Sequence, residues 1–301
     1  MIWLNAVIQG VLLGGFYALL ACGLSIMFGV MRIINLAHGD LAVLGAYVVW
    51  LLLSTYHVPL ALAVVVALAV MLALGYLLQL AVLDRSLRSG VLTPLLATFG
   101  LSVVVQNALL IAFSPDVRSL GGDAGSLAIS SWRLTSEISL PLLGVLTLAV
   151  AILVVEGLQA FLRRTTLGAQ WRAASEDAEA ARVVGIDASR IYAAATALAV
   201  AIAALGGIAL ALRSTFEPSA GPTQLIFAFE AVVIGGLGSL RGTLIGGILL
   251  GIAQALGSVV NPQYAVLAGH LVFLAVLAGR NSGLLSAARW QALRPRGGVT
   301  T

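Results

Sequence analysis

Long stretches without a charged side chain constrain this 301-residue chain more than any other feature. Residues 1–31 contain no Asp, Glu, Lys or Arg, and nine apolar stretches can be read along the sequence. A helix that crosses a bilayer needs about 20 mostly apolar residues. Only 9% of the residues are charged, against about 25% in a soluble domain. A soluble fold of this size could not bury so much apolar surface, so the sequence predicts a polytopic integral membrane protein.

The apolar stretches predict an all-α fold of about eight to nine transmembrane helices, formed by the whole chain (1–301) as a single domain. Polar residues between them predict an exposed loop at 114–140 and a second loop, the longest polar stretch, at 163–190. The sequence leaves open whether the second and seventh stretches cross fully or re-enter. The nine stretches are residues 1–31, 33–54, 58–83, 91–113, 141–162, 191–212, 221–240, 242–260 and 264–279.

The positions of the arginines predict the orientation. If loop 163–190 is cytoplasmic, thirteen arginines fall inside and three, Arg118, Arg133 and Arg213, fall outside. Such an excess is typical of cytoplasmic loops, so we expect the N-terminus outside and the C-terminus in the cytoplasm. The first stretch has no basic start and no small-residue cleavage site, so we expect a retained helix. The thirteen are Arg32, Arg85, Arg88, Arg163, Arg164, Arg172, Arg182, Arg190, Arg241, Arg280, Arg289, Arg294 and Arg296.

Missing residue types exclude several kinds of chemistry. All 16 basic residues are Arg, and a P-loop needs a Lys to reach the phosphates, so we expect the chain not to hydrolyse ATP by itself. Cys22 is the single cysteine, which excludes an intramolecular disulfide or a thiolate cluster. The isolated histidines His38, His57 and His270 do not form a metal-binding pattern. We predict no enzyme activity, no cofactor and no metal; the net charge of +4 indicates basic loops rather than a nucleic-acid partner.

A polar cluster interrupts the second apolar stretch. Asn35, His38 and Asp40 lie around Gly39, and ionisable side chains inside a membrane segment are costly and often functional. We therefore expect these four residues to break the helix and to line or brace a translocation pathway. Two plainer readings stay open: Arg32 marks the membrane edge and the cluster is a solvated helix entry, or His38 is simply packed.

A glycine-rich segment in the second half of the chain is the counterpart. It runs from Glu230 through Gly235, Gly236 and Gly238 to residue 247. Paired glycine-interrupted segments in two halves indicate an inverted-repeat transporter with discontinuous or re-entrant helices, so we assign these residues to the pathway too. The alternative is that the glycines only allow close helix packing.

The loop at 163–190 predicts a short helix over residues 175–184. Ser175 is suited to be its N-cap, Gly185 its C-cap, and Arg182 in the last turn matches the helix dipole. The small face of Ala178, Ala181 and Val184 suits docking on a soluble partner better than insertion into lipid, which bulky side chains favour.

Four ordered motifs near the N-terminus resemble the LivH-type permeases of branched-chain amino acid ABC transporters. They are Gly15-Phe-Tyr-Ala-Leu19, Gly23-Leu-Ser-Ile-Met-Phe-Gly-Val30, Asn35-Leu-Ala-His-Gly-Asp40 and Gly45-Ala-Tyr47. The loop motif Leu167-Gly-Ala-Gln-Trp-Arg-Ala173 with Asp177, Ala180-Ala-Arg182 and Gly185-Ile186, and the motif Ala228-Phe-Glu-Ala-Val-Val-Ile-Gly-Gly-Leu-Gly-Ser239, extend the resemblance over nearly the whole chain. The chain departs from the pattern at Asp40, where Glu is expected, and at Glu230, where Lys is more common.

The resemblance implies a transport subunit of the inner membrane. Such a permease pairs with a second related permease and two ATP-binding cassette subunits, and an extracytoplasmic binding protein delivers its substrate. The loop residues then couple the permease to the ATPase, and those matching the motif are Gly168, Arg172, Ala173, Asp177, Ala181, Arg182 and Gly185.

Other functions stay open on the sequence alone. A urea or short-chain amide importer would share these motifs, so they do not separate the substrates. An ion-coupled secondary transporter or channel would need buried acidic groups to carry the ion, and Asp40, Glu156 and Glu230 are the few that qualify.

Overall fold

The computed structural model describes residues 2–87, 89–90, 92–122, 130–133 and 139–281. The expected cytoplasmic position of the C-terminus falls on residues 282–301, which lie outside the described residues.

Helices occupy all nine of the predicted apolar stretches. Six segments are long and apolar enough to cross a membrane: α1, α3 to α4, α5, α7, α10 and α12, so the expectation of a mostly helical membrane protein is confirmed. The elements are α1 (Ile2–Met31), α2 (His38–Ser54), α3 (Leu60–Leu78), the π-helix η1 (Gln79–Leu83), α4 (Asp84–Leu87), α5 (Thr93–Phe113), β1 (Ser131–Arg133), β2 (Ser139–Pro141), α7 (Leu142–Arg164), α8 (Thr166–Glu176), α9 (Ala178–Val183), α10 (Ala188–Arg213), the 3₁₀-helix η2 (Pro218–Ala220), α11 (Gly221–Gly235), α12 (Leu240–Val260) and α13 (Tyr264–Asn281).

Two of the long helices form the centre of the bundle. In the membrane-length windows of α1 and α10, 83% and 72% of the residues are buried, against 17–22% in α3, α5 and α7. Small residues explain this, because they let backbones approach closely: Gly10 and Gly14 of α1 face Gly251 and Gly247 of α12. The outer helices leave apolar side chains exposed, as lipid-facing helices do.

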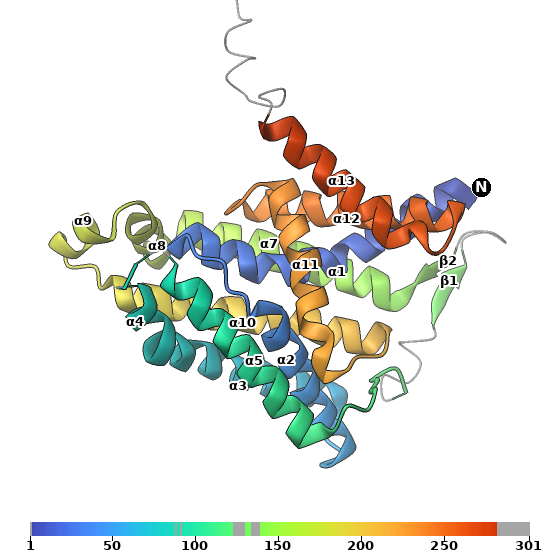
Figure 1. Cartoon of the computed structure of the whole chain (residues 1–301), viewed down its shortest axis with the longest axis horizontal. Coiled ribbons are helices and arrows are strands. Elements are labelled where there is room, and N and C mark those ends of the chain that lie inside the picture. The colour runs from blue at the N-terminus through green and yellow to red at the C-terminus, as the bar shows by residue number, and fades with distance from the viewer. Residues whose placement is uncertain (1, 88, 91, 123–129, 134–138, 282–301) are drawn as a thin grey trace, which may run out of the picture.

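The two ends of the molecule differ in structure. Helices α8 and α9 lie at one end of the long axis, and the short strands β1 and β2 lie at the opposite end, near the N-terminus (Figure 1). The strands pair in antiparallel register, with Trp132 opposite Leu140. Backbone pairing thus gives part of the expected exposed loop 114–140 an ordered two-stranded ribbon, which was not predicted from the sequence.

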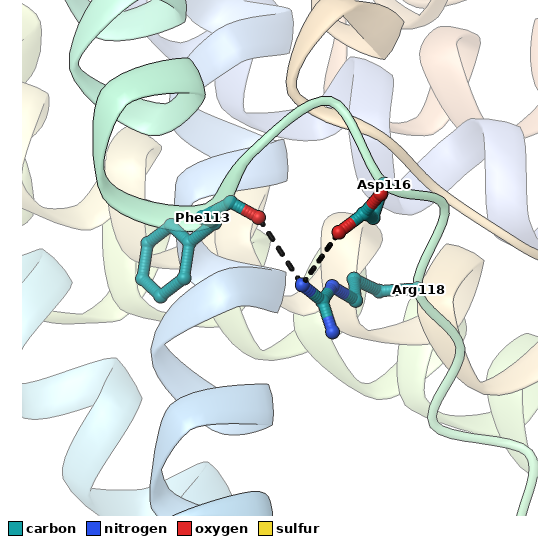
Figure 2. A network of polar contacts seen from close by, with 3 residues as sticks. All are labelled: Phe113, Asp116 and Arg118. Atoms are coloured by element: carbon teal, nitrogen blue, oxygen red, sulfur yellow. Dashed lines mark hydrogen bonds and ion pairs between the residues drawn. The ribbon is translucent and has the colours of Figure 1, made fainter.

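One arginine holds the other described part of this loop against the bundle. Arg118 Nη2 donates to the carbonyl of Phe113 at 3.2 Å and to Asp116 Oδ2 at 3.4 Å (Figure 2). Its guanidinium also lies 4.6 Å from the centre of the Trp50 ring, close enough for a cation–π contact. The backbones of Arg118 and Phe216 exchange two hydrogen bonds of 2.8 and 2.9 Å, so the loop is joined to the segment that leads into α11.

Candidate translocation and coupling sites

Helix α2 begins inside the bundle. His38 Nε2 donates to the Leu20 carbonyl at 2.8 Å, and Leu20 lies 11 residues before Met31, the last residue of α1. At about 1.5 Å per residue, α2 starts about 16 Å inward from that end of α1. The chain reaches this point through non-helical residues 32–37. The predicted break is present, and it is an extended entry followed by a new helix rather than a kink at Gly39.

Side-chain hydrogen bonds replace the missing helix bonds in this entry. Asn35 Oδ1 accepts from the Ala37 N–H at 3.0 Å, which closes a turn typical of Asn. Leu36 N–H donates to Thr98 Oγ1 of α5 at 3.1 Å. Asn35 and His38 are 1% and 0% exposed, so the reading of this cluster as a solvated helix entry is wrong.

Asp40 joins the same network from the first turn of α2. Its Oδ2 accepts from Ser102 Oγ at 2.6 Å, and Ser102 Oγ in turn accepts from Gln106 Nε2 at 3.0 Å. A carboxylate near a helix N-terminus is favoured by the helix dipole. Thr98, Ser102 and Gln106 were missed on the sequence, although their i, i+4, i+8 spacing in an apolar helix was a usable signal.

Helix α11 also begins inside the bundle, against the start of α2. A Cβ placed on Gly39 would lie 2.8 Å from the carbonyl carbon of Gly221 and 2.9 Å from Leu225 N. A Cβ on Gly221 would lie 2.6 Å from Asp40 Cγ. Real Cβ atoms essentially never approach so closely, so only glycine fits at both positions. The N-termini of two short helices therefore meet in the interior, one from each half of the chain.

The glycine-rich segment of the second half does not lie at the meeting point of α2 and α11. Gly236 and Gly238 have φ of 98° and 79° and form the turn between α11 and α12, and Gly238 packs on Gly29 near the end of α1. Gly235 lies in backbone contact with Gly242. The interruption of the second half is at Gly221 and not within 235–247. Glycine supplies positive φ and close helix contact at 235–238, which fits the packing alternative.

Glu230 has a partner that the sequence did not reveal. His270 Nδ1 of α13 lies in hydrogen-bond contact with Glu230 Oε1, and the ring of Phe227 stacks on His270 at 6.3 Å. Helix packing brings these two residues together although they are 40 positions apart in the sequence. The Glu230 side chain is 4% exposed and that of His270 is 39% exposed.

The loop 163–190 holds two helices with different caps from those expected. Thr165 Oγ1 accepts from Gly168 N–H at 2.9 Å and caps α8. Asp177 Oδ1 accepts from the N–H groups of Glu179 and Ala180 at 2.9 and 3.0 Å and caps α9. The prediction that Ser175 is the N-cap was wrong, because Ser175 lies in the last turn of α8 and bonds Arg172 O. Gly185, with φ of 84°, follows α9 as expected of a C-terminal glycine.

The alanine face of this loop points into the protein. Ala181 is 3% exposed, and Trp171 and Ala174 of α8 are buried with it. The prediction that Ala178, Ala181 and Val184 form one exposed docking face was wrong for Ala181, which is buried together with α8; Val184 is 74% exposed and its neighbour Val183 is 88% exposed. These two valines are the apolar side chains of α9 and its C-cap that a partner could reach.

The remaining residues predicted to couple the chain to an ATPase also divide into buried and exposed ones. A Cβ on Gly168 would lie 2.6 Å from the backbone of Leu162, so this glycine lets α8 cross the end of α7. Arg172, Asp177 and Arg182 are exposed and Ala173 is half-buried. Among the described residues, no group of three His, Cys, Asp or Glu side chains is placed to hold a metal ion.

The family model of the branched-chain amino acid transport system / permease component matches residues 6–278. The chain belongs to this family. The resemblance drawn from the sequence motifs is thereby confirmed, and the protein is a permease of this transport family.

The permease is similar to named relatives over almost its full length. It is 29% identical over 293 residues to the high-affinity branched-chain amino acid transport system permease protein BraD of Pseudomonas aeruginosa, covering 94% of this chain and 95% of that one. It is 29% identical over 294 residues, with the same coverage, to LivH of Escherichia coli strain K12. A shorter match, 31% over 132 residues, covers 43% of this chain and 31% of LivM of Salmonella typhimurium. No solved structure matches the permease.

Proposed function

We propose that this permease is the membrane subunit of an ATP-driven importer of branched-chain and other hydrophobic amino acids in the inner membrane. Its partners are a second, related permease, two ATP-binding cassette subunits that hydrolyse ATP, and an extracytoplasmic binding protein. The names of BraD and LivH support the substrate class, and the name of LivM supports a second permease chain. The absence of lysine from the sequence supports ATP hydrolysis by partners, because a P-loop requires that residue.

The meeting of α2 and α11 carries the proposal. Both helices begin inside the bundle, and their N-termini touch through Gly39 and Gly221. Broken helices whose positive ends meet near the midplane are typical of transporters that bind a substrate carboxylate. We assign Asn35, His38, Gly39 and Asp40 to the wall of the pathway. We assign α11 and the turn after it to a second wall of the pathway, one that moves during transport. This segment contains Glu230, Gly235, Gly236 and Gly238.

An inverted repeat accounts for this geometry. The chain enters α2 from the end of α1 and enters α11 from the end of α10, and these ends lie on opposite sides of the bundle. We propose nine crossings, in which residues 32–54 and 214–235 each cross once as an extended entry plus a short helix. The whole chain then forms one transmembrane domain, with loop 114–140 outside and loop 163–190 inside.

The orientation places the N-terminus outside and the C-terminus in the cytoplasm. The arginine distribution supports it, and so do the positions of α8 and α9 at one end of the molecule and the β1–β2 ribbon at the other (Figure 1). A direct test is cysteine labelling at Glu179 and Ser119 in a Cys22→Ala chain. We expect a membrane-impermeant reagent to reach position 119 from outside and position 179 only after the membrane is opened; the reverse pattern would overturn the orientation.

Copurification and transport test the function itself. We expect the permease, extracted in mild detergent, to retain an ATPase subunit, and the reconstituted complex to take up leucine with ATP when its binding protein is present. A binding protein that prefers urea or a short amide would contradict the substrate class. Uptake by the single chain driven by sodium or protons would contradict the whole proposal.

The exposed part of the coupling loop gives a sharper test of the ATPase contact. Arg172, Ala173, Asp177, Arg182 and the valines at 183 and 184 form the outer surface of α8 and α9, while Gly168, Ala181 and Gly185 shape their seat. We expect Val183→Asp to lose the ATPase partner without changing the thermal unfolding of the permease, because the side chain is 88% exposed. Ala181→Trp should instead lower the unfolding temperature, because Ala181 is buried. If Val183→Asp keeps the partner and full ATP-driven uptake, the motor contact lies elsewhere.

A further inference from the structure

A basic pocket of about 550 Å³ opens at the α8 end of the bundle, away from the meeting point of α2 and α11. It lies between the last turns of α1 and α7, helix α8, and the turn that precedes α12. Arg163, Arg172 and Arg241 line it, each from a different helix, and none of the described lining residues is acidic. Three arginine residues, from α7, α8 and α12, therefore border one cavity.

The three arginines differ in how far a neighbouring group balances their positive charge. Glu156 accepts from Arg241 Nε at 2.8 Å and from Arg241 Nη2 at 2.5 Å, so this pair is bidentate and its charge is balanced. The Gln159 side chain is placed to accept from Arg163 at 3.0 Å, which orients that guanidinium. Among the residues that the structure describes, neither Arg163 nor Arg172 forms an ion pair within 4.0 Å, although Arg163 lies close enough to Glu156 to interact with its charge. The pocket thus keeps an excess of positive charge.

The inner wall of the pocket carries a polar group without a partner. Ser25 lines the cavity and is 1% exposed, and its Oγ makes no hydrogen bond within the described part of the chain. A buried hydroxyl left in this state is costly unless a ligand or water meets it. Ser25 is therefore a polar group of this wall whose hydrogen-bonding capacity the described residues leave unused.

The start of α12 adds backbone N–H donors to the wall of the pocket. This 21-residue helix is capped by Ser239, whose Oγ accepts from Gly242 N–H at 3.1 Å, and Ser239 and Leu240 line the pocket. The remaining first-turn amides of a helix and its dipole favour an anion at this end. Ile26, Val30, Leu158 and Leu162 form an apolar side of the same cavity.

From these contacts we infer that the pocket binds a phosphate group carried by a molecule with an aliphatic part. A phosphate offers several acceptor oxygens, which suits donors that arrive from α7, α8 and α12, and arginine recognises it in bidentate fashion. Two sources share this chemistry: the headgroup of an anionic phospholipid in the adjoining leaflet, for which basic pockets between membrane helices are suited, and a free phosphate compound from the aqueous side. Occupancy would tie α8 to the turn before α12, and so link the coupling loop to α11.

Binding to the full-length permease tests this inference. One arm uses phosphatidylcholine nanodiscs with and without phosphatidylglycerol, and native mass spectrometry counts the retained lipid. The other arm titrates inorganic phosphate onto the permease in phosphatidylcholine alone. We expect Arg163→Gln to weaken the bound ligand about tenfold or more, as the loss of a charge-assisted hydrogen bond does. The matched control is Arg164→Gln, which removes the same charge one residue along α7 from a side chain that does not line the pocket.

Ser25→Ala gives a second, uncharged variant that removes only the unpartnered hydroxyl. Loss of phosphatidylglycerol in Arg163→Gln and Ser25→Ala, with retention in Arg164→Gln, identifies the headgroup as the source. Saturable binding of inorganic phosphate with the same dependence identifies a free phosphate compound. Absence of binding in both arms, or an equal loss in Arg164→Gln, would overturn the inference.

Discussion

The two helices that begin inside the bundle, α2 and α11, are held there by different means. The start of α2 is held by directed hydrogen bonds: Leu36 N–H reaches Thr98, and Asp40 reaches Ser102. The start of α11 is held mainly by shape, through the contact of Gly221 with Gly39 and Asp40. The side-chain contact of α11 with α13, between Glu230 and His270, lies further along the helix.

This difference assigns the two helices different roles. Hydrogen bonds to α5 fix the direction of α2, because each has a preferred geometry. Contact between glycine backbones has no such direction and allows sliding as long as the space is kept. We therefore expect α2 to be the fixed side of the meeting point and α11 the side that moves during transport, with the α11–α13 contact as its second support.

The largest expected effect comes from filling the meeting point. Gly39→Leu places a side chain where even a Cβ meets the Gly221 backbone, and overpacking of this kind costs about 1–3 kcal/mol or more. We expect ATP-driven uptake to be abolished while the chain still inserts and keeps its partners. Gly221→Leu should have the same effect from the other side.

The control for this prediction lies on α5. A Cβ on Gly100 meets nothing within 4 Å, so Gly100→Leu should leave uptake close to normal. Normal uptake by Gly39→Leu would mean that the contact of α2 and α11 contributes to helix packing and not to transport.

The next largest effect concerns the second support of α11. His270→Leu leaves the buried carboxyl group of Glu230 without its partner, and removal of one member of a buried pair costs about 3 kcal/mol. We expect a lower unfolding temperature in detergent, with α13 exchanging its amide hydrogens faster. Replacing both residues by leucine should recover much of the loss, because no buried polar group is then left unpaired. A double variant as unstable as the single one would show that the pair does not hold α11 to α13.

A smaller effect is expected on the α2 side. Ser102→Ala removes the donor to Asp40 Oδ2 and should cost about 1–3 kcal/mol of stability. The measurement is again the unfolding temperature, compared with Ser258→Ala, which removes an exposed hydroxyl bonded only to the Ala255 carbonyl. Equal stability of both variants would remove hydrogen bonding as the reason why α2 is fixed.

The smallest effect probes the extended entry itself. Thr98→Val keeps the side-chain shape and removes the acceptor for Leu36 N–H, at a cost of about 1 kcal/mol. We expect faster amide hydrogen exchange at Leu36 and nearly normal uptake. Thr147→Val is the matched control, because the Thr147 hydroxyl bonds only to Leu143 within its own helix. Unchanged exchange at Leu36 would mean that the entry does not depend on α5.

The sequence allowed the membrane segments and the first polar cluster to be predicted, because both depend on local patterns. Apolar length is enough to locate a helix such as α7, and Asn35 to Asp40 stand out because polar residues are rare in such segments. Partners across the bundle could not be predicted: nothing local to His270 indicates Glu230. The seventh apolar stretch was correctly predicted to begin at Gly221, but its contact inside the bundle was missed for the same reason, since Gly221 is one glycine among 33 until packing places it against Gly39.

Competition between similar residues explains the errors in the coupling loop. Thr165, Ser175 and Asp177 are all good cap residues, and the one chosen from sequence is the one inside a helix. Of the small face predicted to dock on a soluble partner, Ala181 is instead buried in the permease itself together with Trp171 and Ala174, and Val184 stays exposed. The pattern of small side chains on a helix predicts that this face packs against another segment. It does not predict whether that segment belongs to the same chain or to a partner.

The pairing of Arg118 with Phe216 has a mechanical consequence. Loop 114–140 and the segment before α11 share two backbone hydrogen bonds, and Leu120 N–H donates a third to the carbonyl of Ala211 in α10 at 2.8 Å. Only residues 217–220 separate Phe216 from the first residue of α11. A displacement of loop 114–140 would therefore be transmitted to Gly221 through a strut four residues long, without passing through the lipid-facing helices. Lengthening that strut by a flexible insertion would leave both ends folded and disconnect this loop from the meeting point of α2 and α11.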